Sequence, residues 1–371
     1  MLASPPFANF TKRLFHEYFP PPRFLEMPAV GLNISDDAVL VVELVRYKNA
    51  YAVGRYGRRP LPRESILGGY VNDKDAVVGE LRKLKSDLGL DFVNASLSEE
   101  KAYLFKTKIP RVTRKEIRAA LEFKLEENVP IPAQEAIFDY TVITGGGHGE
   151  EDHLDIGVTV LPKKVVETYI ELLDAAGLVP LSFEIEAQAI TRAVIQKGDR
   201  GTYLVVNFGE SKTGLFIVSG EVVRFTSTVA IGGVHITEAI AKSLSVSSEE
   251  AVRIKHAKTA LSDKKNMDIF LSLMSALSAL KDEINKLSTY WHTHTSEGES
   301  AEPKISNMIL CGRDAALPGF ADYLTPSLQC GVSVGNVWQN TLSLGDYIPP
   351  IPFDESLDYA AAVGLALPKG H

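Results

Sequence analysis

Two stretches of the chain, GLNISDDAVLVVEL at residues 31–44 and VVNFGESKTGLFIV at residues 205–218, share one pattern. In each stretch, an apolar strand containing one Asn ends at a polar turn that holds Gly or Ser. A second strand rich in Val, Leu and Ile follows. A β-hairpin of this kind can offer backbone N–H groups to an anion. Because the pattern occurs twice, we predict a protein with two lobes whose paired hairpins could grip one polyphosphate.

The bulk composition is that of a globular protein with more than one domain. Of the 371 residues, 45% are hydrophobic and 23% are charged, which is enough for roughly two to three domains. The formal net charge is −8 and no stripe of Lys and Arg alternates with aromatic residues, so a nucleic-acid partner is not expected. The two cysteines, Cys311 and Cys330, lack metal-binding spacing and fit a reducing compartment.

The first 28 residues contain an amphipathic stretch, PFANFTKRLFHEYFPPP, which stops at three prolines. Its apolar residues recur at helical spacing with Lys12 and Arg13 between them. Such a segment can lie on a membrane surface, dock on a partner, or fold back on its own domain. Neither a run of about 18 apolar residues nor a secretion signal is found. We therefore expect a cytoplasmic protein, with peripheral membrane association as one role for this segment.

Helical and extended patterns alternate between the two hairpins. Apolar spacing predicts a helix over residues 75–90. Residues 101–187 then give strand, helix, strand, strand, helix and strand, which we interpret as a small α+β module inserted between the hairpins. Its first helix begins with a capping box formed by Thr113 and Glu116. The TGGGHGEEDH run at residues 144–153 is predicted to be a solvated loop, and no metal site is expected.

Beyond the second hairpin, the pattern becomes largely helical. Residues 230–246 pass through a Gly pair into a helix, residues 247–261 predict another, and residues 269–294 predict a long one. The last quarter predicts a buried strand, a glycine turn and a helix over residues 305–324. It closes with a helix of small residues at 359–367 that can pack tightly on a strand.

This order of elements resembles the actin-like ATPase superfamily, which includes sugar kinases, the seventy-kilodalton heat-shock chaperones and the cell-division protein FtsA. Within it, the chain resembles the PilM family of type IV pilus assembly proteins. The stretches that carry the resemblance are VGLNISDDAVLVVEL, EIRAALEFKLEENVPIPAQEAIFDYTVI, YLVVNFGESKTGLFIVSGEVV, IGGVHITEAIAKSL, NMILCGRDAALPGFADYL and YAAAVGLAL. They span nearly the whole chain from about Ala29.

The resemblance implies an α/β fold: a two-lobed actin-like (ribonuclease-H-like) architecture with an inserted small α+β module of the SHS2 type. The implied divisions are an N-terminal tail (1–28), a first lobe (29–100 and 181–198), the inserted module (101–180), a second lobe (199–233 and 303–371) and a helical subdomain of the second lobe (234–302).

The resemblance also implies a cleft between the lobes that binds ATP, with Mg²⁺. Carried over position by position, its residues are Gly31, Asn33 and Ser35 in a first phosphate loop, Asn207, Gly209, Ser211 and Thr213 in a second, Gly232 and Gly233 at the crossing, Gly312, Arg313 and Asp314 beside the adenosine, and Glu250 and Arg253 on one helix face towards the ribose and base.

Several of these positions depart from the pattern of the family. The departures are Asn33 and Asn207 in place of acidic residues, Ser35 in place of Gly, Leu40 in place of Lys, and Arg313 and Asp314 in place of glycines. The missing carboxylates are the groups that would hold hydrated Mg²⁺ and position an attacking water. Asp36 and Asp37 could partly replace them. We therefore expect a degenerate ATPase cleft without efficient catalysis, and we assign no catalytic residue.

The implied function is that of a scaffold at the inner face of the cytoplasmic membrane, in a type IV pilus or a related secretion machine. Its expected partners are the cytoplasmic tail of a PilN-like inner-membrane protein and other pilus assembly components. A groove for the tail is expected between the inserted module and the first lobe, beside strand residues 101–109. The apolar residues expected there, which could equally form the core of the module, are Phe123, Leu125, Val129 and Ile131. Two alternatives keep the same fold, namely a slow ATPase or phosphotransferase and an FtsA-like filament protein.

Overall fold

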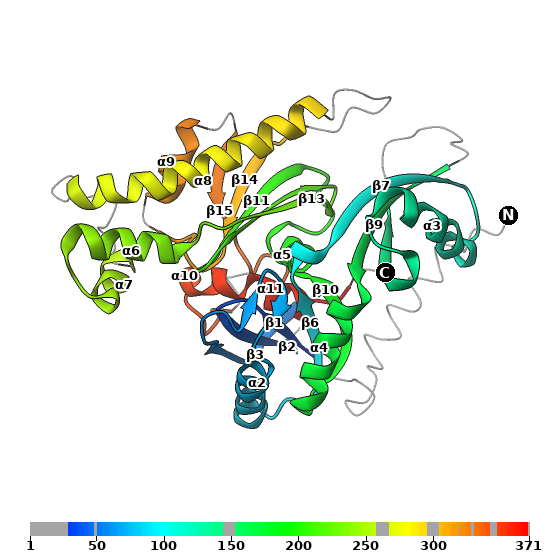
Figure 1. Cartoon of the computed structure of the whole chain (residues 1–371), viewed down its shortest axis with the longest axis horizontal. Coiled ribbons are helices and arrows are strands. Elements are labelled where there is room, and N and C mark those ends of the chain that lie inside the picture. Colours follow the sequence, from blue (N-terminus) through cyan, green and yellow to red (C-terminus); the bar gives the residue numbers. More distant parts are fainter. Residues whose placement is uncertain are drawn as a thin grey trace.

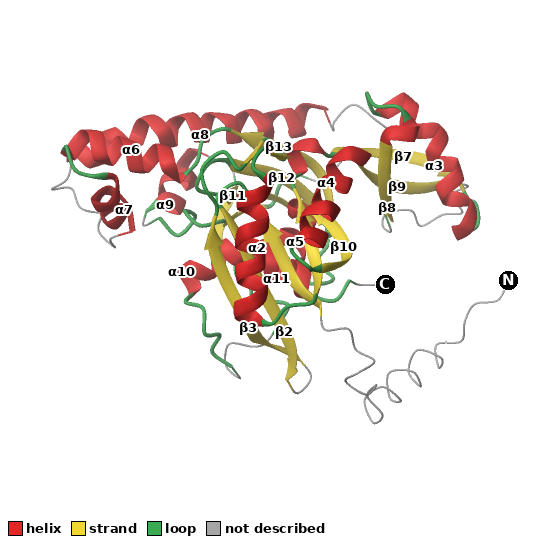
Figure 2. Ribbon diagram, turned by 60° about the horizontal axis from the view of Figure 1, so that its bottom comes forward, coloured by secondary structure: helices red, strands yellow, loops and turns green. Residues whose placement is uncertain are grey.

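Two five-stranded sheets form the body of the molecule, with helices between them and a smaller sheet to one side (Figures 1 and 2). The computed structural model describes residues 29–47, 50–143, 153–256, 267–294, 304–317, 319–327, 330–341 and 347–369. The N-terminal segment predicted to be amphipathic therefore lies outside the described residues, as does most of the loop at 144–153.

The first sheet has the strand order β10-β6-β1-β2-β3. Its strands are β1 (Ala29–Ile34), β2 (Ala38–Tyr47), β3 (Ala50–Pro60), β6 (Phe92–Leu97) and β10 (Val179–Ile185). Strand β1 pairs antiparallel with β2 and parallel with β6. Helices α2 (Lys74–Leu88) and α4 (Lys163–Ala175) lie on the side of this sheet away from the second sheet (Figure 1).

The second sheet repeats that order as β15-β14-β11-β12-β13. Its strands are β11 (Thr202–Phe208), β12 (Thr213–Ser219), β13 (Val222–Val229), β14 (Asn307–Cys311) and β15 (Gly331–Val334). Strand β11 again pairs antiparallel with the strand that follows it and parallel with β14. The two hairpins singled out in the sequence are β1–β2 and β11–β12, so the predicted two-lobed α/β architecture is confirmed.

Two helices fill the space between the sheets, α5 (Glu186–Val194) and α11 (Ala360–Ala366). Their contact is very close because small residues meet there: a Cβ placed on Gly364 would lie 1.7 Å from the carbonyl oxygen of Ala189. Helix α11 approaches β1 in the same way, since a Cβ on Gly31 would lie 1.9 Å from the carbonyl oxygen of Ala362. The small-residue helix predicted at the end of the chain thus brings both lobes together.

The smaller sheet has the order β7-β9-β8 and is covered by α3 (Arg114–Asn128). Its strands are β7 (Tyr103–Pro110), β8 (Ala136–Val142) and β9 (His153–Pro162). The side chains between this sheet and α3 form a core of their own. Helix α4, which the predicted boundary at residue 180 assigns to the module, packs on α2 and β10 as well as on β9, and its apolar face joins the core of the first lobe.

A group of helices extends from the second sheet, made of α6 (Gly233–Leu244), α7 (Ser248–His256) and α8 (Met267–His294). The remaining short elements are β4 (Ile66–Leu67), β5 (Tyr70–Val71), η2 (Glu99–Lys101), η3 (Ala133–Glu135), α9 (Phe320–Leu324), η4 (Thr325–Ser327), α10 (Phe353–Ser356) and η5 (Leu357–Tyr359). Within the described part of the chain, none of these helices combines the length and the apolar character needed to cross a membrane.

An arginine attaches the C-terminal segment to the first sheet. Arg58 on β3 donates to Asp37 in the first hairpin turn at 2.7 Å and to Asp358 in η5 at 3.0 Å. Burial raises the pKa of Asp358 to about 6, although Arg58 opposes the shift, and the nearby Asp37 adds to it. The start of α11 is therefore held by a carboxyl group that keeps its proton to a higher pH than an ordinary aspartate does.

The close contact of α5 and α11 can be tested with single methyl groups. We expect Gly364→Ala to lower the free energy of unfolding by about 1 to 3 kcal/mol or more, because the added Cβ collides with backbone that cannot move away independently. Gly79→Ala is the matched control, since nothing lies within 4 Å of its Cβ position in α2; there a gain of up to about 1 kcal/mol is expected. Urea denaturation of both variants measures the difference. Equal effects in the two variants would contradict the packing described.

The raised pKa of Asp358 predicts a particular dependence of stability on pH. Between the usual pKa of an aspartate and about 6, the folded state retains a proton that the unfolded state releases. The corresponding stability is present below pH 4 and is lost as the pH rises to about 6. Relative to Asp358→Asn, the wild type should lose roughly 2 to 3 kcal/mol over that window. Urea unfolding at several pH values tests this, and parallel curves for the two proteins would contradict it.

Candidate functional site

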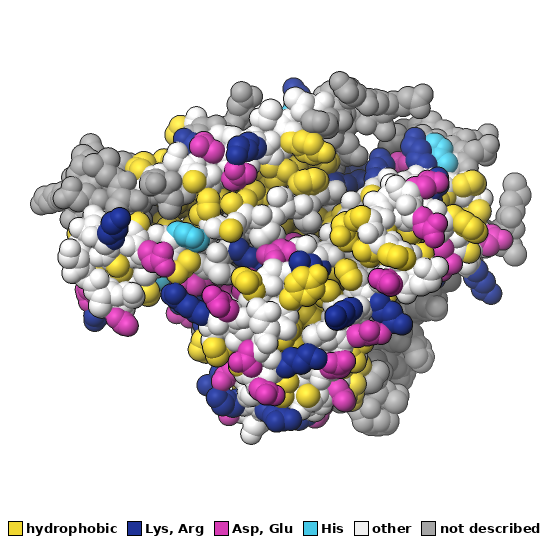
Figure 3. All heavy atoms as spheres, in the orientation of Figure 1, with side chains coloured by type: hydrophobic (Ala, Val, Ile, Leu, Met, Phe, Trp, Pro, Cys, Tyr) yellow, Lys and Arg dark blue, Asp and Glu magenta, His cyan; other side chains and the backbone are white. Residues whose placement is uncertain are grey.

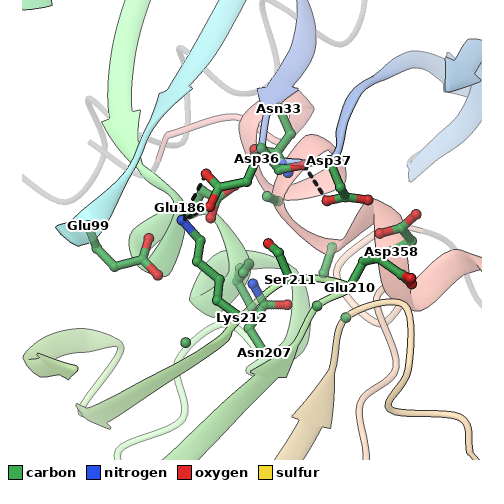
Figure 4. A pocket seen from close by; sticks show the side chains of 17 residues that line it. Asn33, Asp36, Asp37, Glu99, Glu186, Asn207, Glu210, Ser211, Lys212 and Asp358 are labelled. Carbon is green, nitrogen blue, oxygen red and sulfur yellow. Dashed lines mark hydrogen bonds and ion pairs between the residues drawn. The ribbon is translucent and has the colours of Figure 1, made fainter. Parts of the chain in front are cut away.

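A small cavity lies where the two hairpin turns face each other between the lobes (Figure 4). Its volume is about 40 Å³, which is room for a few water molecules. Carboxylates dominate its lining. They are Asp36, Asp37, Glu99, Glu186, Glu210 and Asp358, and Lys212 is the one lysine among the lining residues.

Lys212 ties the second hairpin turn to the first lobe. Its Nζ lies 2.9 Å from the carboxylate of Asp36 in the first turn and 2.8 Å from that of Glu100 in η2. Figure 4 shows the Lys212 side chain reaching across the cavity to Asp36, with Glu99 pointing in from the side. Burial by itself would lower the pKa of Lys212, but Asp36, Glu186 and Glu100 outweigh it and raise that pKa. The lysine is therefore firmly charged.

Two further carboxyl groups of the cavity are almost fully buried. Burial raises the pKa of Glu186, the first residue of α5, well above its usual value, and Glu99 adds to the shift. Burial likewise raises the pKa of Glu99, against the opposing charge of Lys212. One carboxylate oxygen of Glu99 has no hydrogen-bond partner. The cavity thus concentrates acidic groups around a single lysine.

The Asn at the end of β1 fits this acidic surrounding. Asn33 is buried, its Oδ1 accepts a hydrogen bond from the hydroxyl of Ser96 at 2.7 Å, and it also bonds the carboxyl of Glu186. An aspartate at this position would place one more negative charge beside Glu186 and Glu99. The neutral amide avoids that repulsion, which amounts to about 4 kcal/mol for two unit charges 4 Å apart at an effective dielectric constant of 20.

The polar groups of the two hairpin turns are largely bonded to one another within each turn. The backbone N–H of Ser35 donates to the carbonyl of Ala38 at 2.9 Å, and the Ser35 hydroxyl accepts from the Ala38 N–H at 3.2 Å. In the second turn the Gly209 N–H donates to the carbonyl of Lys212 at 3.0 Å. The Thr213 hydroxyl donates to the carbonyl of Ile231. The Ser35 and Gly209 groups, predicted to receive phosphate, therefore close the turns, and the Thr213 hydroxyl instead bonds the segment that follows β13.

The start of α6 is also engaged with the second turn. The N–H groups of Gly233 and Val234 donate to the carbonyls of Gly209 and Glu210, at 2.9 and 2.8 Å. A Cβ on Gly232 would lie 2.5 Å from the Glu210 carbonyl oxygen, so the glycine is needed for this close approach. The amides that a helix N-terminus usually offers to an anion are here bonded to protein.

A second lysine fills the region predicted for the adenosine. Lys255, near the end of α7, has a fully buried side chain whose Nζ lies 2.9 Å from Asp314 and 3.2 Å from the carbonyl of Gly233. A Cβ on Gly233 would fall on the Asp314 carboxylate. Gly312 has φ of +92°, and its Cβ position is 2.7 Å from the amide oxygen of Asn207. This turn is therefore packed against β11 and α6.

The structure brings together part of the predicted nucleotide site. The predicted residues that line the cavity are Asn33, Ser35, Asn207, Gly209, Ser211 and Gly312. Gly31 does not, because it faces α11, and Arg313 lies beside the lining residue Glu210 at 3.9 Å. Glu250 and Arg253 form an ion pair with each other on the exposed side of α7. Neither side chain lines the cavity, so their assignment to a ribose and base stays a prediction.

The four residues predicted to bind a partner differ in where the structure places them. Leu125 and Val129 belong to the buried core between α3 and the small sheet, so their assignment to a groove is wrong, and Ile131 packs partly buried against the same core. Phe123 is on the opposite face of α3 and is 81% exposed. The helical spacing of these positions was compatible with either role, and the observed orientation decides between them.

A larger hollow adjoins the cavity, with a volume of about 560 Å³. Its walls come from the β4–β5 hairpin, from η2 and the residue that follows it, and from β13 at the edge of the second sheet. The contributing residues include Leu67, Gly68, Lys101, Ala102, Thr226 and Thr228. Asp36, Glu99, Ser211 and Lys212 line both this hollow and the cavity. We call the hollow the junction groove, because it lies between the two lobes, where η2 leads towards β7 of the small sheet.

ATP with Mg²⁺ does not fit the cavity in this arrangement. Nucleotide sites have volumes of roughly 300 to 1,000 Å³, against about 40 Å³ here. Ionised carboxylates only accept hydrogen bonds, and the lysine and the amides named above already have partners. Among the described residues, no group of three or more His, Cys, Asp or Glu side chains is placed to hold a metal ion.

Sequence reasoning did not find Lys212, Lys255, Glu99 or Glu186. The lysine of a polar turn such as GESKTG is normally expected to be exposed to solvent. The carboxylate partners of Lys212 lie more than one hundred residues away in the sequence. The one available signal was the density of acids in both turns, because buried carboxylates need a cation.

Comparison with known proteins agrees with this architecture. The family of type IV pilus assembly protein PilM matches residues 31–369. Among solved structures, a PilM–PilN type IV pilus biogenesis complex has a chain with a TM-score of 0.74 and 22% identity, covering 92% of this chain and 98% of its own. The ethanolamine utilization protein EutJ from Carboxydothermus hydrogenoformans has a TM-score of 0.55 and 16% identity, with coverage of 94% and 90%.

A third solved structure is similar as well. MreB5 of Spiroplasma citri, in a structure bound to ADP, has a TM-score of 0.53 and 12% identity, with coverage of 91% of this chain and 94% of its own. These likenesses support the actin-like fold, and the family match extends over nearly all of the described chain. The chain therefore belongs to the family of type IV pilus assembly protein PilM.

Proposed function

We propose that this chain is a scaffold of a type IV pilus assembly platform that binds the cytoplasmic tail of a PilN-like inner-membrane protein in the junction groove. The observation that carries the proposal is the family match over residues 31–369 combined with a groove of about 560 Å³. The similar PilM–PilN complex supports a partner of this kind. Such a partner would hold the chain at the inner face of the cytoplasmic membrane.

The groove has the features that an extended peptide needs. Strand β13 stands at the edge of its sheet and contributes Thr226, Ser227 and Thr228 to the lining. An edge strand can pair its backbone with an added strand. Opposite it, Leu67 is 59% exposed and offers apolar surface. We infer that the tail lies extended along β13 with an apolar residue against Leu67.

The charge of the groove favours a tail that carries a basic residue. Asp36, Glu99 and Glu100 contribute acidic groups, against Lys101 and Lys212. Lys212 is held by Asp36 and Glu100, whereas the Lys101 ammonium lies over the ring of Tyr70, 4.1 Å from its centroid. A basic tail residue near η2 would meet a lining in which acids outnumber lysines. Complementary charge of this kind fixes orientation more than it adds affinity.

The inserted module is proposed to stand beside this groove without lining it. We assign β7, α3, β8 and β9 to the module and α4 to the first lobe, on the packing described above. Figure 3 shows hydrophobic side chains gathered on the module at the right, while acidic and basic side chains are interspersed over the lower lobe. Exposed apolar surface on the module suits contacts with further assembly components.

A pair of arginine substitutions tests where the tail binds. We expect Leu67→Arg to weaken binding of a synthetic PilN-like tail peptide by at least about tenfold, because it removes apolar surface and brings a bulky charge into the groove. Phe123→Arg is the matched control on α3, an exposed apolar residue outside the groove, and should leave the dissociation constant unchanged. Fluorescence anisotropy with a labelled peptide measures both.

If Phe123→Arg alone weakened binding of the peptide, the tail would have to bind on the outer face of α3 and not in the junction groove. Absence of binding by the wild type, with the peptide from the same organism, would reject the scaffold proposal in this form. Thermal unfolding of both variants checks that the substitutions leave the fold intact.

A further inference from the structure

We propose that Lys212 is a built-in latch, which joins the two lobes across the cleft predicted for ATP and takes the place of a nucleotide there. The first observation is connectivity. Lys212 belongs to the second lobe, while its two partners, Asp36 and Glu100, belong to the first lobe and to the start of the small-sheet segment. One side chain thus bridges elements more than one hundred residues apart in sequence.

The second observation is burial. The side chains of Lys212, Asp36 and Glu100 retain only 19%, 11% and 16% exposure. Ion pairs that are shielded from solvent are screened little by salt, and removing one partner leaves the other charge uncompensated. The chain also holds a contrasting pair, Lys74 with Glu171 at 2.6 Å, whose side chains are 52% and 64% exposed. An exposed pair of that kind contributes little to stability.

The third observation concerns the hydrogen-bond donors that an anion would need. Gly233 and Val234 at the start of α6 donate to carbonyls of the second turn, and Gly209 donates within that turn. The ammonium group of Lys212 already faces two carboxylates. A phosphate entering this cleft would have to displace existing bonds to reach the N–H groups of Gly209, Gly233 and Val234 or the Lys212 ammonium.

The fourth observation is that the other end of the predicted nucleotide site is filled in the same manner. The fully buried Lys255 pairs with Asp314 at 2.9 Å, and Asp314 is itself 1% exposed. Gly233 makes room for that carboxylate, since a Cβ there would lie 1.7 Å from its Oδ2. Two lysine–carboxylate pairs within the chain therefore occupy both ends of the site, one beside the hairpin turns and one beside the adenosine turn.

The test compares Lys212→Met with Lys74→Met in the full chain. Methionine keeps the length of the side chain and removes the charge in both cases. We expect Lys212→Met to lower the melting temperature by at least about 5 °C, and to increase amide hydrogen exchange in residues 33–38 and 207–213 by at least about tenfold. Lys74→Met should change neither. Lys212→Arg, which retains the charge, should recover most of both effects.

Calorimetric titration of the wild type with ATP and MgCl₂ completes the test and needs no variant. We expect no saturable binding up to millimolar ATP, and no rise in melting temperature on adding it. Saturable binding of ATP by the wild type would overturn the proposal, because the Lys212 side chain and a bound triphosphate would occupy the same space. Exchange in the two turns that stays unchanged in Lys212→Met would overturn it as well. Neither result depends on whether a tail peptide binds the junction groove.

Discussion

Taking a lysine out of water between two lobes costs several kcal/mol unless carboxylates compensate its charge. In this protein the cost is offset by Asp36 and Glu100, which reach Lys212 from another part of the chain. The same requirement operates in reverse, because the acids that crowd the cavity would repel one another without that cation. Asn33 in place of an aspartate reduces the repulsion further. The opposed hairpin turns, the buried acids and the lysine therefore form one electrostatic unit.

This unit depends on how closely the lobes approach, and the small residues of α5, α11 and β1 set that distance. Helix α11 touches β1 at Gly31 and α5 at Gly364, in both cases with backbone against backbone. A bulkier residue at either point would separate the layers, and an ion pair of 2.8 to 2.9 Å tolerates little separation. Arg58 reinforces the arrangement by fixing Asp37 and Asp358, which flank the first turn and the start of α11. Packing thus positions the charges, and the charges in turn hold the turns against each other.

The sequence predicted the features that repeat locally and missed those that depend on distant partners. Apolar alternation and turn residues were sufficient to place both hairpins and the small-residue helix at residues 359–367, and their order indicated two lobes. The roles of Leu125 and Val129 could not be decided, because a buried and a groove-lining residue have the same helical spacing. Lys212 and Lys255 could not be recognised as buried, since the carboxylates that compensate them come from distant parts of the chain: Asp36 and Glu100 for Lys212, and Asp314 in the turn after β14 for Lys255. Gly31 lies within a phosphate-loop pattern, but the neighbour that requires a glycine there is the carbonyl of Ala362.

The cavity and the junction groove are separated by a wall that both share. Asp36, Glu99, Ser211 and Lys212 line the two spaces, so a group that approaches Asp36 from the groove competes with Lys212 for the same carboxylate. Such competition is a coupling free energy, and it acts equally in both directions. A stronger ion pair between Lys212 and Asp36 leaves less negative charge for a ligand in the groove. A cation in the groove weakens that ion pair in turn. In a fold whose lobes are joined by an internal ion pair, the charge on a partner peptide can therefore influence lobe closure directly, through side chains that belong to both sites.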